Sequence, residues 1–136
     1  MAANQIRLSV ASTPVGASSA RRQLVNRMRE WADVLDQQVL DNAELVVAEL
    51  LVNAVQHAGG GPIAAGARLG DDGLLIEVID TSPVFPALGL PSMDAENGRG
   101  LLLVSALADR HGVEPVPPGK RCWAQFKVGA PLPAIS

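Results

Sequence analysis

The sequence predicts an α+β two-layer sandwich, in which a mixed, mostly antiparallel sheet carries helices on one face. Strand and helix periodicities follow one another as strand, helix, helix, strand, strand, loop, helix, strand, strand, an order typical of two packed layers. The last segment, Arg121–Val128, alternates apolar and polar residues, which indicates a sheet with one face in water. We expect residues 1–136 to form a single domain, because 136 residues with 48% hydrophobic content suffice for one core.

A strand and two helices are predicted in the N-terminal half. Residues 6–10 alternate between apolar and polar side chains, as a short, half-buried strand does. From Gly16 to about Leu35, apolar residues recur every three or four positions, which predicts a helix capped by Ser18 or Ser19. A second helix is expected over Gln37–His57.

A hairpin and a long loop are predicted in the middle of the chain. The strands Ile63–Leu69 and Leu74–Asp80 are joined by Gly70-Asp71-Asp72-Gly73, a sequence suited to a tight turn. The proline-containing stretch Thr81–Asn97 shows no periodicity, and loops of this length are often lids or binding segments. A helix over Leu101–Arg110, a strand start and proline-rich turn over His111–Gly119, and the final strand complete the chain.

The charge and composition exclude several classes of protein. A formal net charge of −3 provides no basic surface for nucleic acid, so we expect no direct contact with DNA or RNA. The single cysteine, Cys122, excludes an internal disulfide, as is usual in a reducing compartment. Because no apolar run is long enough to span a membrane and no signal segment is recognisable, we expect a cytoplasmic protein without membrane contact.

The most informative pattern is a polar stripe on the second predicted helix. Glu49, Asn53 and His57 recur every fourth position within an apolar run, so their side chains share one face of the helix. A buried polar group without a partner costs about 1–3 kcal/mol. The stripe therefore requires a neighbouring strand, or a cleft with a ligand, a metal ion or water. His57 alone is equally consistent with a helix-end residue that the helix dipole favours.

Two further segments are candidates for binding. Asp80 ends a predicted strand where the loop begins, which suits either a turn-opening carboxylate or a site. Asn97-Gly98-Arg99-Gly100-Leu101 precedes a predicted helix, where glycines permit close backbone approach and free N–H groups attract phosphate. An ordinary loop-to-helix junction would have the same composition.

In this order, the helix stripe, the strand-end aspartate and the Gly-x-Gly helix start resemble the Bergerat-fold (GHKL) superfamily of ATPases and kinases. Residues 49–58 resemble its N box, Asp80 its G1 aspartate, and 98–101 its G2 box. Within the superfamily, the chain is most similar to single-domain anti-sigma-factor serine/threonine switch kinases, which have a histidine-kinase-like ATPase domain. The likeness extends from Gly16 to Val128.

The resemblance implies ATP and Mg²⁺ as cofactors and a role for each matching residue. Asn53 would coordinate Mg²⁺, Asp80 would receive the adenine amino group, and Glu49 would be the catalytic base. Backbone N–H groups of the two G2 glycines would bind phosphate. The predicted cofactor-binding set is Asn53, His57, Asp80, Gly98, Arg99, Gly100 and Leu101, together with Lys120, which departs from the family pattern.

The chain departs from the family pattern at two positions. Ser82 occupies the place of the glycine that many relatives carry two residues after the aspartate. Gly119 is followed by Lys120 where relatives often carry a hydroxyl residue. Lys120 could replace that hydroxyl as a phosphate contact, but the sequence favours a solvated lysine in a turn.

Three functions remain open from the sequence. The resemblance implies a serine/threonine protein kinase that binds a sigma factor and phosphorylates an anti-anti-sigma protein of the STAS type. A nucleotide-binding regulator that sequesters its partner without phosphoryl transfer is the alternative, and an α/β interaction domain without nucleotide is the third. A homodimer is one expected assembly because such relatives are often dimeric, although the composition neither supports nor opposes it.

Overall fold

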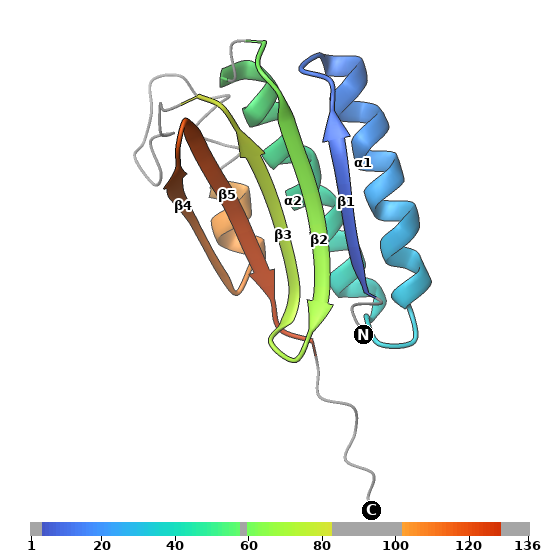
Figure 1. Ribbon diagram of the computed structural model, residues 1–136. Helices are drawn as coiled ribbons and strands as arrows, with labels where there is room; N and C mark the ends of the chain where they lie inside the picture. Colours follow the sequence, from blue (N-terminus) through green and yellow to red (C-terminus); the bar gives the residue numbers. More distant parts are fainter. Residues whose placement is uncertain (1–3, 58–59, 83–101, 129–136) are drawn as a thin grey trace, which may run out of the picture.

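The computed structural model describes residues 4–57, 60–82 and 102–128, which form a sheet with helices on one face (Figure 1). The strand order of the five-stranded sheet is β1-β2-β3-β5-β4. Each pairing within it is antiparallel, so the predicted α+β sandwich is confirmed and no parallel pair joins the described strands. The elements are β1 (Gln5–Val10), α1 (Pro14–Met28), a 3₁₀ turn (Arg29–Trp31), α2 (Gln37–His57), β2 (Ile63–Gly70), β3 (Gly73–Asp80), β4 (Arg110–Val116) and β5 (Gly119–Phe126).

The hairpin between β2 and β3 forms where the sequence predicts it. Gly70 pairs with Gly73 across the turn, and Gly73 has a φ of 101°, a conformation that glycine adopts without strain. A Cβ atom at Gly73 would also lie 2.2 Å from the carbonyl oxygen of Phe126. The turn glycine is therefore required by both its backbone angle and its surroundings.

Helix α1 begins and ends earlier than the sequence predicts. The Thr13 hydroxyl accepts a hydrogen bond from the Gly16 N–H at 2.9 Å, so the predicted cap at Ser18 or Ser19 is wrong. Proline follows the cap at the start of the helix, where its fixed φ fits and its missing N–H costs nothing. The helix ends at Met28 rather than Leu35, although Leu35 remains 1% exposed, which is why the apolar periodicity continues past the helix.

The predicted helix over 101–110 is also too long. Residues 102–107 are helical, and Arg110 already belongs to β4. Arg110 pairs with Gln125, and Asp109 donates its N–H to the Gln125 carbonyl at 2.9 Å. Pairing with β5, a contact between distant residues, therefore overrides the local helical spacing.

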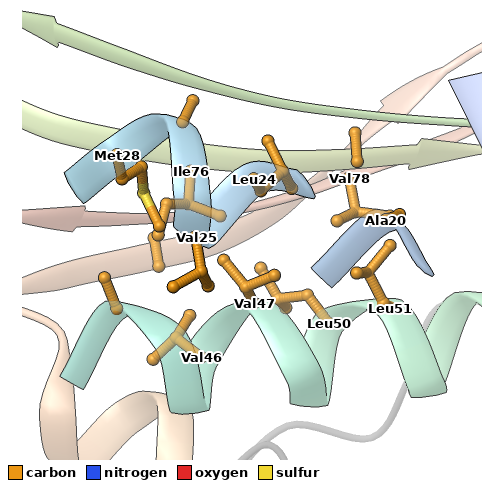
Figure 2. Close-up of a cluster of buried hydrophobic side chains, with 14 of the residues drawn as sticks. Ala20, Leu24, Val25, Met28, Val46, Val47, Leu50, Leu51, Ile76 and Val78 are labelled. Atoms are coloured by element: carbon orange, nitrogen blue, oxygen red, sulfur yellow. The ribbon is translucent and has the colours of Figure 1, made fainter. Parts of the chain in front are cut away.

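The core lies between the two helices and the inner face of the sheet. Figure 2 shows side chains of α1, among them Leu24 and Met28, facing Val46 and Val47 of α2, with Ile76 of β3 beside them; all five are fully buried. The outer face of the sheet instead carries ion pairs. Arg121 on β5 pairs with Glu77 and Glu114, and its guanidinium lies 5.9 Å from the centre of the Trp123 ring. No helix among the described residues is long and apolar enough to cross a membrane.

Candidate functional site

Three elements end together at one end of the sandwich. The C-terminal end of α2, the C-terminal end of β3 and the beginning of β5 lie at the same end of the molecule (Figure 1). Helix α2 packs against both of these strands. Asp80, the last residue of β3, is directly opposite Lys120 in the β3–β5 register. Residues from three separate parts of the sequence are thereby placed near one another.

The polar stripe on α2 borders the core on the side away from α1. The opposite flank of α2 meets α1, because Glu44 accepts a hydrogen bond from Arg21 at 2.9 Å. At 3.6 residues per turn, Glu49, Asn53 and His57 project from the other flank. Asn53 is 8% exposed, while Glu49 and His57 are half-buried. The prediction that Glu49 and Asn53 lie at the edge of the core is therefore confirmed.

The Asn53 amide is a nearly buried polar group that the described residues leave without a partner. Its side chain makes no hydrogen bond within residues 4–57, 60–82 and 102–128, and the half-buried Glu49 carboxylate makes no ion pair there. The amide retains some exposure and makes no hydrogen bond among these residues, so the position fits a ligand or water. An Mg²⁺ ion held by one protein oxygen together with phosphates and waters fits this donor set, because Mg²⁺ does not need a cage of protein ligands.

Asp80 and Lys120 form a buried ion pair. The Lys120 ammonium lies 3.0 Å from both carboxylate oxygens of Asp80 and 3.4 Å from the carbonyl oxygen of Ser82. The Ser82 N–H donates to Oδ1 of Asp80 at 2.8 Å. Lys120 is 0% exposed and Asp80 3%. The prediction of a solvated turn lysine is wrong, because β5 already begins at Gly119 and directs Lys120 inward.

Gly119 allows the two charged residues to meet. A Cβ atom at this position would lie 1.9 Å from the carbonyl oxygen of Asp80 and 2.5 Å from Cα of Thr81. Only a residue without a side chain fits between these backbones. The sequence contains a signal for this arrangement, because Lys120 is in phase with Cys122 and Ala124, the buried side of β5.

The structure therefore tests only part of the predicted set of residues. It brings Asp80 and Lys120 into contact and places Asn53, with Glu49 and His57, on the helix that packs over the same strands. The predicted phosphate-binding residues Gly98, Arg99, Gly100 and Leu101 lie outside the described residues. So does the predicted lid, apart from Thr81 and Ser82.

The pKa of Cys122 shows that the adjoining part of β5 is buried from solvent. Burial raises the pKa of the Cys122 thiol from 9.0 to about 11; the Lys120 charge opposes this shift and the Asp80 charge adds to it. On the outer face, burial lowers the pKa of Arg121, but hydrogen bonds and charge from Glu77 and Glu114 outweigh it and raise the pKa overall. The inner face of β5 is thus apolar except at the ion pair.

This fold and site define an α+β sandwich with a group of polar side chains at one end of its sheet. Residues 10–126 match the histidine kinase-like ATPase domain family, and the chain belongs to that family. The sequence-based recognition of a GHKL fold is therefore confirmed.

Comparison with solved structures gives the same fold. The chain is similar to the crystal structure of the RsbU and RsbW domains of Rv1364c from Mycobacterium tuberculosis, with a TM-score of 0.70 and 20% sequence identity. The match covers 93% of this chain and 33% of that chain, so this chain spans about a third of the length of that protein. At this identity the likeness shows the fold alone. No curated protein sequence matches this chain.

Proposed function

We propose that this chain is an ATP- and Mg²⁺-dependent serine/threonine protein kinase that acts as an anti-sigma or related regulatory factor. Its substrate would be an anti-anti-sigma protein of the STAS type. The observation that carries the proposal is a nearly buried Asn53 amide that has no hydrogen-bond partner among the described residues. It lies on a helix packed over the strand that ends at Asp80, in a histidine kinase-like ATPase domain.

Each named side chain has one task in this proposal. Asp80 would accept a hydrogen bond from the adenine amino group, and the Asn53 amide oxygen would hold Mg²⁺. Mg²⁺, when bound, would supply positive charge to the phosphates. Glu49 lies one helical turn before Asn53, and its carboxylate would take the proton from the attacking serine or threonine hydroxyl. Gly98 and Gly100 would donate backbone N–H groups to phosphate.

Calorimetry with ATP or ADP, with and without Mg²⁺, tests nucleotide binding. We expect Mg²⁺ to tighten binding in the wild type, and Asn53→Ala to lose that gain while retaining the metal-independent part. Asn42→Ala is the matched control, because Asn42 lies on the same helix near its other end. If the wild type bound nucleotide equally well with and without Mg²⁺, the assignment of Asn53 as a metal ligand would be wrong.

Phosphoryl transfer needs a separate experiment. Incubation with ATP, Mg²⁺ and a cognate anti-anti-sigma candidate should label the candidate on serine or threonine. Glu49→Ala should abolish labelling while leaving ATP affinity intact, and Glu30→Ala, an exposed glutamate outside the site, should label normally. Labelling that survives Glu49→Ala would refute the assignment of the base.

A regulator that binds nucleotide and sequesters its partner without transfer is the second candidate. It is favoured by an apolar groove between α1 and α2, lined by Ala17, Leu51 and Val55. Val15 and Val52, at 77% and 45% exposed, add further apolar surface on these helices, as protein-binding faces often do. This candidate predicts that Glu49→Ala leaves partner inhibition unchanged in a reporter assay that includes the anti-anti-sigma protein, whereas the kinase predicts that loss of phosphoryl transfer changes the inhibition in that assay.

A further inference from the structure

Lys120 is a fully buried charge that the proposed kinase chemistry does not use. Taking an ammonium and a carboxylate out of water is costly, and an apolar pair of similar volume is often equally stable. The Lys120–Asp80 pair nevertheless sits at 0% and 3% exposure. Stability alone therefore does not account for a lysine at this position.

The carboxylate of the pair has an unused acceptor position, and one of the three ammonium contacts is weak. Oδ1 of Asp80 accepts from both Lys120 and the Ser82 N–H, whereas Oδ2 meets only the Lys120 ammonium among the contacts of the described residues. A carboxylate has about four acceptor positions and an ammonium three protons. The remaining ammonium contact, to the Ser82 carbonyl, is long at 3.4 Å. One acceptor position on Oδ2 and one weakly held proton on Lys120 thus lie side by side.

We propose that Lys120 reads the nucleobase together with Asp80. Oδ2 of Asp80 accepts from the exocyclic amino group of adenine, and the Lys120 ammonium donates to the adjacent ring nitrogen N1. This inference rests on the proposed function, because it requires adenine at Asp80. Adenine presents a donor next to an acceptor on its Watson–Crick edge, which is the complement of an acceptor next to a donor in the protein.

The proposal makes Lys120 a specificity-determining residue. A carboxylate alone would accept from the amino group but could not test the ring nitrogen. With Lys120 beside it, a base that lacks an acceptor at this place leaves a buried ammonium proton poorly paired. Loss of such a charged hydrogen bond weakens binding on the order of tenfold or more.

The test compares ADP with 1-deaza-ADP, in which a C–H group replaces only the N1 acceptor. Calorimetry on the full chain should show 1-deaza-ADP binding about tenfold more weakly than ADP. Lys120→Met should bring the two affinities close together, because the donor that reads N1 is gone. Lys127→Met, which removes the exposed lysine at position 127, is the matched control and should keep the wild-type ratio.

The outcomes separate this inference from the proposed function. If ADP does not bind at all, the proposed function fails. If ADP binds and 1-deaza-ADP binds equally well to the wild type, Lys120 does not read the base and the inference is overturned. A purely structural lysine would change stability without changing this ratio. The wild-type comparison decides the matter even if Lys120→Met does not fold, and Lys120→Thr offers a second, smaller variant in which a hydroxyl replaces the ammonium.

Discussion

Lys120 and Asp80 face each other across the β3–β5 ladder, with the ammonium nitrogen 3.0 Å from both carboxylate oxygens and neither side chain open to solvent. Their meeting depends on Gly119, whose bare backbone lies against that of Asp80 and Thr81. An apolar inner face continues along β5 from this point. The candidate site and the core are consequently built on the same strand.

Lys120→Met should destabilise the fold strongly. The substitution leaves the Asp80 carboxylate buried without its cation, and breaking a buried pair in this way typically costs about 3–5 kcal/mol. Urea unfolding measures the loss, and Lys127→Met, at an exposed position, should change stability by less than about 0.5 kcal/mol. Replacing both partners, Lys120→Met with Asp80→Leu, should recover most of the loss. If the single substitution Lys120→Met left the protein as stable as the wild type, the pair would not be buried in solution.

Gly119→Ala should damage both the fold and nucleotide binding. The new Cβ would fall 1.9 Å from the Asp80 carbonyl oxygen, so the strands must separate, and forced overpacking costs about 1–3 kcal/mol. Gly70→Ala is the control, because no atom lies within 4 Å of a Cβ built there. We expect denaturant midpoints to fall for the first variant and to stay near the wild-type value for the second. Equal midpoints would contradict the close approach of the backbones.

Stability should decrease above pH 9 because of Cys122. Its folded-state pKa of about 11 exceeds the ordinary value of 9.0, so between these values the unfolded chain releases a proton that the folded chain retains. The contribution is intact below pH 9 and is lost as the pH rises towards 11, at about 1.4 kcal/mol per pH unit. Urea unfolding of the wild type and of Cys122→Ala at pH 8 and pH 10 isolates this contribution. If both proteins lost the same free energy of unfolding between these pH values, the contribution of Cys122 would be excluded.

Thr13→Ala should cost about 1 kcal/mol, the usual value for a lost helix cap. The Thr13 hydroxyl accepts the Gly16 N–H, and alanine leaves that donor without a partner. Ser19→Ala is the informative comparison, because Ser19 only accepts an exposed hydrogen bond from Gln23 and should be nearly neutral. If Ser19→Ala were more destabilising than Thr13→Ala in a denaturation experiment, Ser19 would be the helix cap, as the sequence alone suggested.

The predictions that succeeded rested on local patterns. The bounds of α2, the position of Asn53 at the edge of the core, and the hairpin at Gly73 follow from periodicity and turn chemistry within a few residues. The failures came from contacts between distant residues. Lys120 was assigned to solvent because its partner, Asp80, is 40 residues away, and Arg110 was assigned to a helix because its pairing with Gln125 is not visible locally.

Some of the candidate site was recognised through resemblance rather than physics. The spacing of Glu49 and Asn53 alone does not specify a nucleotide. The nucleotide is inferred from the likeness to the family motif. The cap at Thr13, in contrast, could have been predicted physically, because a threonine followed by proline is a well-understood helix start. The inward direction of Lys120 was also readable, from its phase with Cys122.

The continuity of Lys120 with Cys122 and Ala124 along one face of β5 has a practical consequence. Any molecule that occupies the end of this strand in the folded protein raises the melting temperature in proportion to the logarithm of its concentration over its dissociation constant. Candidate nucleotides and their analogues can therefore be ranked by thermal shift before any partner protein is known.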